Sequence, residues 1–240
     1  MSAVRIESSL KRIRVLFGGV VIVDTKSAKL MTSWDSPFYP LYYFNVTELP
    51  EKYLQGKQAI SDGSQYDVVV GARKAPAALQ LFSSGDRAGF FKLNFSAMDA
   101  WFEEEEQIFV HPKDPYKRVD VLQSSRHVRV EIDGVEVANT TKPRLLFETS
   151  LPVRTYIPKT DCKLDLLVPS DLKTSCPYKG EASYYHVQLS PNNRKDNVVW
   201  WYRNANLECA SITGFVAFYD EKVDVWVDGE KQTRPSTHWS

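Results

Sequence analysis

The chain has little cysteine, no long apolar run and no net charge, and each absence argues against one class of protein. Its three cysteines, Cys162, Cys176 and Cys209, all lie in the second half of the 240 residues. Three thiols form no balanced disulfide framework, so we expect a reducing compartment and a cytoplasmic protein. No stretch approaches the roughly 18 apolar residues of a membrane span, so we expect no membrane association.

The sequence also lacks an excess of charge of either sign. The chain carries 30 basic and 30 acidic side chains, and its 43% hydrophobic and 25% charged residues are ordinary for a globular protein. Binding to nucleic acid requires a basic face, and none stands out in the sequence. We therefore expect a small-molecule ligand and no nucleic acid, and nothing in the sequence indicates an oligomeric state.

Signatures of metals and nucleotides are missing as well. Cys162, Cys176, His186 and Cys209 offer the ligand types of a zinc site, but no two of them have the spacing of about two to four residues that structural zinc sites show. No glycine-rich phosphate loop of the Walker or dinucleotide type occurs. We expect neither a metal nor a nucleotide cofactor.

The chain does contain one β-rich sequence pattern that occurs twice. Residues 14–23 have a counterpart 115 residues later in residues 129–138. Residues 89–101 keep a glycine-phenylalanine pair, an aspartate and a tryptophan that recur 125 residues later in residues 214–226. Such self-similarity predicts two tandem, related domains.

The local patterns are those of antiparallel strands. Apolar and polar residues alternate over 128–132, and Asp133-Gly134 then forms the turn of a hairpin, as Gly18-Gly19 does in the first copy. Short helices are expected at residues 49–55 and 158–162. Strands are expected at 66–70, 91–95, 98–102, 164–168, 216–219 and 223–227. The predicted fold is mainly β: two small antiparallel β domains, rolls or barrels, with minor short helices.

A proline-stiffened connector joins the two copies. Pro112 and Pro115 begin it, and Val119 and Val121 give it apolar surface to bury. We predict a first domain at residues 1–123, which includes the connecting strap at 111–123, and a second domain at 124–240.

Only the second copy carries a dense polar insert at residues 174–185, with Cys176-Pro-Tyr-Lys-Gly180 inside it. In the first copy, we interpret residues 62–66 as the remnant of this insert. Residues 29–33 of the first copy likewise replace residues 144–148. Chemistry that depends on the insert therefore belongs to the second copy alone.

With these motifs in view, the chain resembles the tandem form of the family known as domain of unknown function 427. The matching stretches are residues 101–105, 111–116, 124–130, 144–149, 176–180 and 214–219. The family is also classed as nucleotidyltransferase-like, but the paired metal-binding acids that nucleotidyl transfer normally uses are not evident in the chain. The resemblance implies the architecture and places Arg144, Glu148 and the Cys176-to-Gly180 motif at family positions.

The insert supplies the candidate catalytic residues. Cys176, Tyr178 and Lys179 bring a thiol, a phenol and an ammonium together, and Glu148 is the fourth candidate. The alternative is structural: Cys176 is a small buried apolar residue, and Lys179 pairs with a carboxylate such as Glu148 to hold the loop.

Five further residues are candidates for ligand binding: Arg144, Arg154, Tyr156, Tyr184 and Trp200. Strand alternation puts Arg154 and Tyr156 on one face, where a guanidinium and a phenol would hold a carboxylate or an enolate. The alternatives are that Arg144 and Glu148 form a buried pair that fixes the sheet, and that the aromatic rings simply fill a β core.

Two functions remain open from the sequence. The first is a metal-independent enzyme that acts on a small carbonyl- or carboxylate-bearing, partly aromatic molecule in a pocket of the second domain. The second is a non-catalytic module that binds a ligand or a protein. A nucleotidyltransferase ranks behind both.

Overall fold

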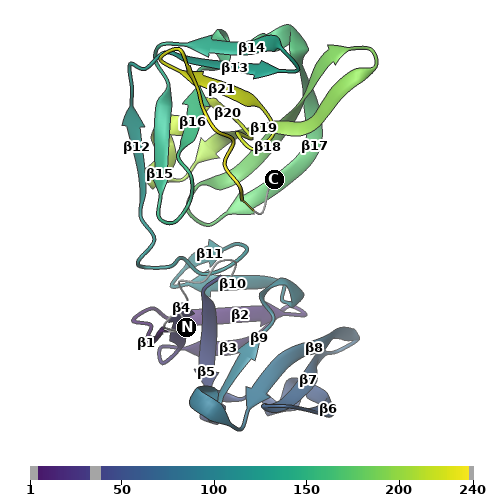
Figure 1. The fold of residues 1–240 in the computed structure, drawn as a ribbon. Helices are drawn as coiled ribbons and strands as arrows, with labels where there is room; N and C mark the ends of the chain where they lie inside the picture. Colours follow the sequence, from purple (N-terminus) through teal and green to yellow (C-terminus); the bar gives the residue numbers. More distant parts are fainter. Residues whose placement is uncertain (1–4, 33–38, 238–240) are drawn as a thin grey trace. The chain divides into compact units, whose positions relative to one another are not determined.

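The computed structural model describes residues 5–32 and 39–237. The chain divides into two compact units, Met1–Asp114 and Pro115–Ser240, and both are built almost entirely from strands (Figure 1). Among the described residues the helical segments are 3-10 turns of three residues each, apart from the six-residue turn Leu207–Ile212. The prediction of a mainly β protein is confirmed.

In the first unit the described strands are β1 (Arg5–Ser8), β2 (Ile13–Phe17), β3 (Val20–Thr25), β4 (Lys29–Thr32), β5 (Leu41–Asn45), β6 (Leu54–Ile60), β7 (Gly63–Val70), β8 (Arg73–Phe82), β9 (Phe90–Leu93), β10 (Ala100–Glu103) and β11 (Glu106–Ile108). The 3-10 turns are η1 (Val46–Glu48), η2 (Glu51–Tyr53), η3 (Gly85–Arg87) and η4 (Phe95–Ala97).

In the second unit the strands are β12 (Val119–Gln123), β13 (Val128–Ile132), β14 (Val135–Thr140), β15 (Arg144–Glu148), β16 (Arg154–Ile157), β17 (Leu167–Cys176), β18 (Gly180–Ser190), β19 (Asn193–Ala205), β20 (Val216–Phe218), β21 (Asp224–Val227) and β22 (Glu230–Lys231). The 3-10 turns are η5 (Lys159–Asp161), η6 (Leu164–Leu166) and η7 (Leu207–Ile212).

Both units arrange their strands in the same order. The seven-stranded sheet runs β1-β4-β5-β9-β8-β7-β6 in the first unit and β12-β15-β16-β20-β19-β18-β17 in the second. The four-stranded sheets run β11-β10-β2-β3 and, read in the same sense, β22-β21-β13-β14. Every strand thus has its counterpart at the same place in the other unit, which is the arrangement a duplicated chain is expected to adopt.

A hydrophobic core joins the large and the small sheet of each unit. In the second unit Val130 and Val225 of the small sheet pack with Ile157 and Val199 of the large sheet. Because successive side chains of a strand point to opposite faces, Tyr156 next to Ile157 faces away from this core and joins a second cluster. The second cluster lies on the face of the large sheet that carries the candidate site.

The division between the units lies earlier than the predicted boundary after Gln123. Strand β12 pairs along its whole length with β15, from Val119 opposite Glu148 to Gln123 opposite Arg144. Its backbone hydrogen bonds and its apolar residues belong to the second unit, so β12 is the first strand of that unit rather than the end of the first.

The polar insert is part of the sheet. Residues 164–168, predicted as a strand, begin with the 3-10 turn η6, and only from Leu167 onward does the long strand β17 run. Strand β17 pairs with β18 from Leu167 opposite Val187 to Cys176 opposite Gly180. In the first unit the turn between β6 and β7, which includes Asp62, stands at the same topological position, as the comparison of the two copies indicated.

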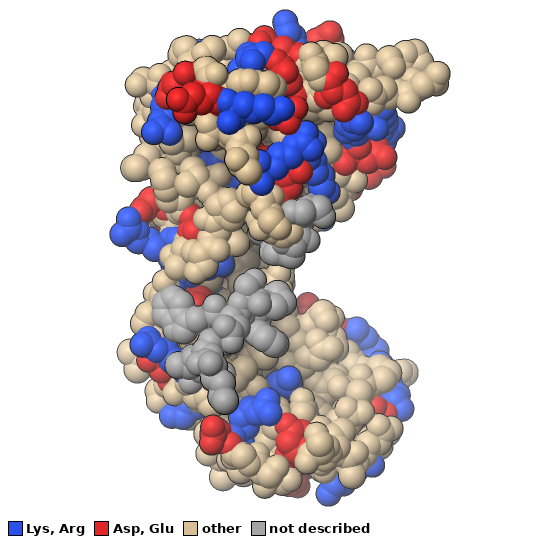
Figure 2. Space-filling model, viewed as in Figure 1, with Lys and Arg blue, Asp and Glu red and all other residues tan. Residues whose placement is uncertain are grey.

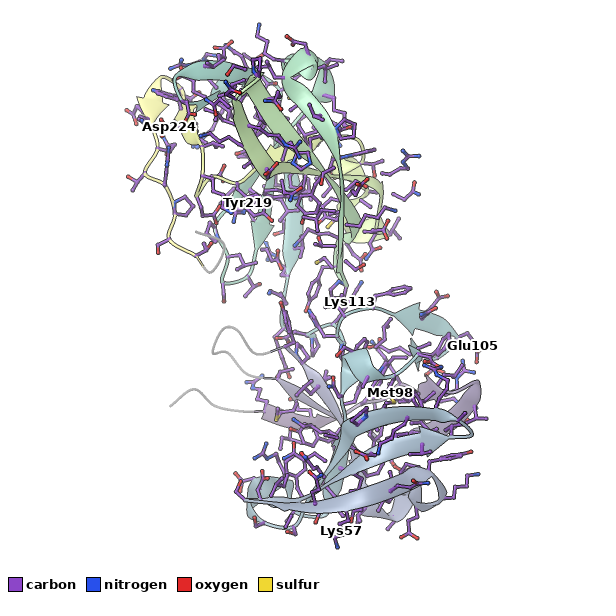
Figure 3. The ribbon with its side chains drawn as sticks, turned by 90° about the vertical axis from the view of Figure 1, so that its right-hand side faces the viewer. Lys57, Met98, Glu105, Lys113, Tyr219 and Asp224 are labelled. Carbon is purple, nitrogen blue, oxygen red and sulfur yellow. The ribbon has the colours of Figure 1, made fainter. Side chains whose placement is uncertain are left out.

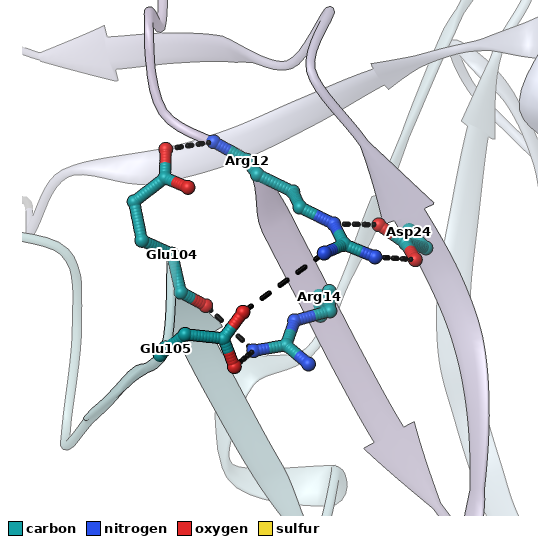
Figure 4. A network of polar contacts seen from close by, with 5 residues as sticks. All are labelled: Arg12, Arg14, Asp24, Glu104 and Glu105. Carbon is teal, nitrogen blue, oxygen red and sulfur yellow. Dashed lines mark hydrogen bonds and ion pairs between the residues drawn. The ribbon is translucent and has the colours of Figure 1, made fainter.

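The surface carries charges of both signs. On the face shown in Figure 2, basic and acidic side chains are intermixed over each unit. A local network in the first unit is typical: Arg12 forms a two-pronged pair with Asp24 at 2.7 and 2.5 Å, and Arg14 contacts Glu105 at 2.7 Å (Figure 4). Pairs as exposed as these contribute little to stability.

The described residues include no helix long and apolar enough to cross a membrane.

Candidate functional site

The turn between β17 and β18 presents the Cys176-to-Gly180 motif. Cys176 ends β17, Gly180 begins β18, and the two residues lie opposite each other in the register. Gly180 has φ +102°, and a Cβ atom there would lie 2.9 Å from the carbonyl oxygen of Asn204. Only glycine allows this approach to β19, so the residue fixes where the turn sits.

Asn206, the residue between β19 and η7, holds the turn. Its side-chain Nδ2 donates to the carbonyl oxygen of Pro177 at 2.8 Å, and its backbone N–H donates to the carbonyl oxygen of Lys179 at 3.1 Å. These bonds satisfy backbone carbonyls that a tight turn would otherwise leave open. The turn is therefore a rigid platform for the side chains that it carries.

At the centre of the site Glu148 lies between two lysines. Lys179 Nζ donates to Glu148 Oε2, and Lys117 Nζ lies 3.4 Å from Glu148 Oε1. The exposed fractions of the side chains are 14% for Lys179, 6% for Glu148 and 29% for Lys117. We call these three residues the lysine–glutamate cluster; two ammonium groups against one carboxylate leave it with one excess positive charge.

The environment keeps Lys179 charged. Burial alone would lower the pKa of Lys179, but Cys176, the carboxylate of Glu148 and the hydrogen bond to Glu148 together raise that pKa above its ordinary value. Lys179 is therefore an ammonium group at neutral pH. It can bind an anion or donate a proton, but it cannot serve as a base.

Tyr178 and Cys176 complete the turn. Tyr178 is 7% exposed, and Lys117 Nζ lies 5.6 Å from the centre of its ring. Cys176 is partly exposed, whereas Cys209 on η7 is fully buried and burial raises the pKa of its thiol to about 11. Of these two thiols, Cys176 is the one that a ligand can reach.

An aromatic cluster covers the adjoining face of the large sheet. Trp200 Nε1 donates to the phenol oxygen of Tyr156 at 3.1 Å, and the hydroxyls of Tyr184 and Thr174 lie 2.8 Å apart. Burial raises the pKa of Tyr156 and of Tyr202 well above the ordinary value, so both phenols stay protonated. These rings pack in a core cluster, as the structural alternative predicts for aromatic β residues.

Arg154 belongs to this face and is held by acids. It forms a two-pronged pair with Glu221 at 2.9 and 2.6 Å and contacts Asp220 at 3.4 Å. Its guanidinium carbon also lies 5.7 Å from the centre of the Trp200 ring. Burial raises the pKa of Asp220 to about 6, and Arg154 opposes this rise.

The predicted pair of Arg144 and Glu148 does not form. Arg144 donates instead to the carbonyl oxygen of Ser211 near the end of η7, and its guanidinium carbon lies 4.6 Å from the Phe215 ring. Both residues project from the same face of β15, but they stand at its opposite ends, and each finds a nearer partner. The alternative pair, Lys179 with Glu148, is the one present.

The structure thus separates the nine predicted residues. Cys176, Tyr178, Lys179 and Glu148 come together at the turn, while Arg144 lies near η7. Arg154, Tyr156, Tyr184 and Trp200 pack on the sheet face. Within the described residues no three His, Cys, Asp or Glu side chains lie close enough to hold a metal ion. His186, one of the candidate ligands, instead accepts a hydrogen bond from the backbone of Asn197.

Three residues of the site were not found from the sequence. Lys117 lies in the connector, Asn206 precedes η7 and Glu221 lies in the turn after β20. Each reaches the site over a long separation in the chain, and no spacing pattern reports such contacts. Only Glu221 had a signal in the sequence, because it lies between the strands predicted at residues 216–219 and 223–227.

Comparison with known families now bears on this site. The model of the family described as Domain of unknown function (DUF427) matches residues 120–229. Over these residues the second unit is similar to the DUF427 family. No curated protein matches the chain.

The DUF427 match contains Glu148 and the whole turn from Cys176 to Gly180, whereas Lys117 lies just before it. The match supports the resemblance drawn from the sequence for the second unit. That the first unit is a further copy of DUF427 stays a prediction, which the identical strand order of the two units supports. Ser33, the predicted counterpart of Glu148, lies outside the described residues.

Proposed function

We propose that the second unit of this chain binds a small organic molecule through a carboxylate or carbonyl oxygen, at the lysine–glutamate cluster. One observation carries the proposal: Glu148 neutralises only one of the two ammonium groups that contact it. An anionic oxygen beside Lys117 and Lys179 would balance the remaining charge. The phenol ring of Tyr178 would pack against an aromatic part of the ligand.

We further propose that the domain is an enzyme that needs no metal. The reactions that fit the cluster are addition to a carbonyl group and removal of a proton beside one, because both place negative charge on oxygen. The Lys179 ammonium would stabilise that charge and donate a proton to it. Cys176, at the other end of the turn, would supply the nucleophile or the proton acceptor.

A panel of small organic acids tests the binding step. Benzoate, pyruvate and their hydroxy and oxo relatives are added to the full chain, and the melting temperature is measured. We expect at least one acid to raise it. The Lys117→Met variant should lose this response, because Lys117 is the most exposed residue of the cluster and contributes more to the ligand than to the fold.

Lys173→Met is the matched control. Lys173 lies on the same hairpin and pairs with Glu181 at 2.8 Å, but both of these side chains are exposed. The acids should raise the melting temperature of the Lys173→Met variant as much as that of the wild type. If no acid raises the melting temperature, or if Lys117→Met responds equally, the proposal fails.

The non-catalytic alternative rests on the same close pairing of Lys179 with Glu148, which suits recognition as well as chemistry. Cys176→Ser separates the two functions. The enzyme proposal requires this variant to bind the acid while the conversion followed by mass spectrometry stops. A binding module would convert no acid in either form of the protein.

A further inference from the structure

The large sheet of the first unit carries a row of polar side chains on the face opposite its hydrophobic core. Lys29 lies opposite Tyr43, Lys92 opposite Gln80 and Gln80 opposite Gln65. Because Phe44 pairs with Phe91, the register also places Tyr43 across from Lys92. These five residues, from five neighbouring strands, form what we call the polar row.

The same positions in the second unit are filled differently. There the row reads Arg144, Tyr156, Ala217, Trp200 and Tyr184. All but Arg144 pack in the aromatic cluster, whereas the polar row contributes nothing to the core cluster of the first unit. One fold therefore carries two faces of different chemistry, although Tyr43 of the polar row and the neighbouring Phe82 are themselves buried.

Two cations stand at this row. The guanidinium carbon of Arg87 lies 4.4 Å, and Lys92 Nζ 5.9 Å, from the centre of the Phe82 ring. Arg87 pairs with Asp62 at 2.9 Å. Lys92, which is half-buried, has no ion-pair or hydrogen-bond partner within the part of the chain that the structure describes. One positive charge is left over where burial makes it costly.

The hydroxyl of Tyr43 is a second polar group of this row without a partner among the described residues. Tyr43 is 1% exposed, its ring centre lies 5.6 Å from that of Phe82, and its buried hydroxyl has no hydrogen-bond partner among the described residues. Burial raises the pKa of Tyr43, and the nearby Arg87 opposes the rise. An unpaired buried hydroxyl costs about 1–3 kcal/mol, so a partner that supplies an acceptor would be favoured.

We propose that the polar row is a second ligand site, which binds an organic molecule through an oxyanion group, a carboxylate or a phosphate. The oxyanion lies between Lys92 and Arg87 and accepts the hydroxyl proton of Tyr43 in a hydrogen bond. The amides of Gln80 and Gln65 bind polar substituents of the ligand. The first unit is then a binding domain rather than a support.

Nuclear magnetic resonance of the full, ¹⁵N-labelled chain tests this site with two probes, inorganic phosphate and benzoate. We expect one or both to shift the backbone amides of Tyr43, Arg87 and Lys92. A response to benzoate alone assigns a carboxylate, and a response to phosphate alone assigns a phosphate. Shifts at residues 176–180 report the other site, so the two proposals stand or fall separately.

Two variants establish the role of the row. Lys92→Met should weaken binding about ten-fold or more, whereas Lys57→Met, on the outer strand β6 (Figure 3), should leave it unchanged. Tyr43→Phe should weaken binding several-fold without lowering the melting temperature of the ligand-free protein, because it removes a hydroxyl that has no partner. The proposal is overturned if neither probe moves these amides, or if Lys92→Met binds as the wild type does.

Discussion

At the scale of single residues, the lysine–glutamate cluster is the part of the site for which the sequence was most useful. The pairing of Lys179 with Glu148 across 31 positions was one of the two interpretations of the Cys176-to-Gly180 motif, and it is present. The presence of Lys117 was not foreseen. A connector residue has no periodicity that would tie it to a strand end, so its position depends on tertiary packing alone.

The two partners of this pair should differ in what they contribute to stability. Glu148→Gln leaves two neighbouring ammonium groups without a counter-charge and should lower the free energy of unfolding by about 3 kcal/mol. Lys179→Met leaves Glu148 paired with Lys117 and should cost only about 1 kcal/mol. Urea unfolding of the two variants measures both values. Equal losses would mean that Lys117 does not share the carboxylate.

Asp220 should make the stability of the protein depend on pH. Its folded pKa of about 6 lies above its unfolded value, so the folded state holds the proton more tightly and stability falls as pH rises from about 4 to 6. Asp220→Asn removes this contribution. Relative to the variant, the wild type should therefore lose about 1–2 kcal/mol between pH 4.5 and pH 7 in urea unfolding. A difference that stays constant with pH would show that Asp220 titrates normally.

At the scale of elements, the hairpins and the alternating strands follow from the sequence because their period and turn residues are local. Asp133-Gly134 turns between β13 and β14 as predicted. The insert at residues 174–185 was read as a loop because its polar residues mask a strand pattern. Those residues tolerate the strand because many of them are exposed along β17 and the first part of β18, where an apolar pattern is not required.

Gly180→Ala tests whether the turn is held as tightly as its contacts indicate. The added Cβ meets the backbone of Asn204, and the positive φ adds strain, so we expect a loss of about 2 kcal/mol or more. Gly134→Ala is the matched control: its φ is +80°, but nothing lies within 4 Å of the added atom, so it should cost about 1 kcal/mol. Thermal unfolding compares the two. If Gly180→Ala is as mild as the control, the turn is free to move.

At the scale of the whole molecule, the repeated motifs predicted a duplication, and the identical strand orders of the two units agree with this prediction. The position of the boundary could not be predicted, because the sequence alone does not distinguish a connector with prolines from a β strand whose partner is unknown. Strand β12 pairs with β15 and closes one edge of the large sheet of the second unit. Its residues Val119 and Val121 also pack against the aromatic cluster.

Two fragments of the second unit should therefore behave differently. A fragment of residues 115–240 retains β12 and should unfold cooperatively on heating. A fragment of residues 124–240, cut at the predicted boundary, loses that strand and exposes β15, so it should melt at a lower temperature or fail to fold. Circular dichroism follows both transitions. Equal melting temperatures would show that β12 is dispensable to the unit.

The central claim is that the excess positive charge around Glu148 binds a small organic acid. The most direct measurement is the nuclear magnetic resonance spectrum of the full ¹⁵N-labelled chain during titration with benzoate and pyruvate. The account predicts that the amides of Tyr178, Lys179 and Gly180 shift in the wild type and in Lys173→Met but not in Lys117→Met. Amides that stay in place with both acids, or that shift equally in Lys117→Met, would contradict it.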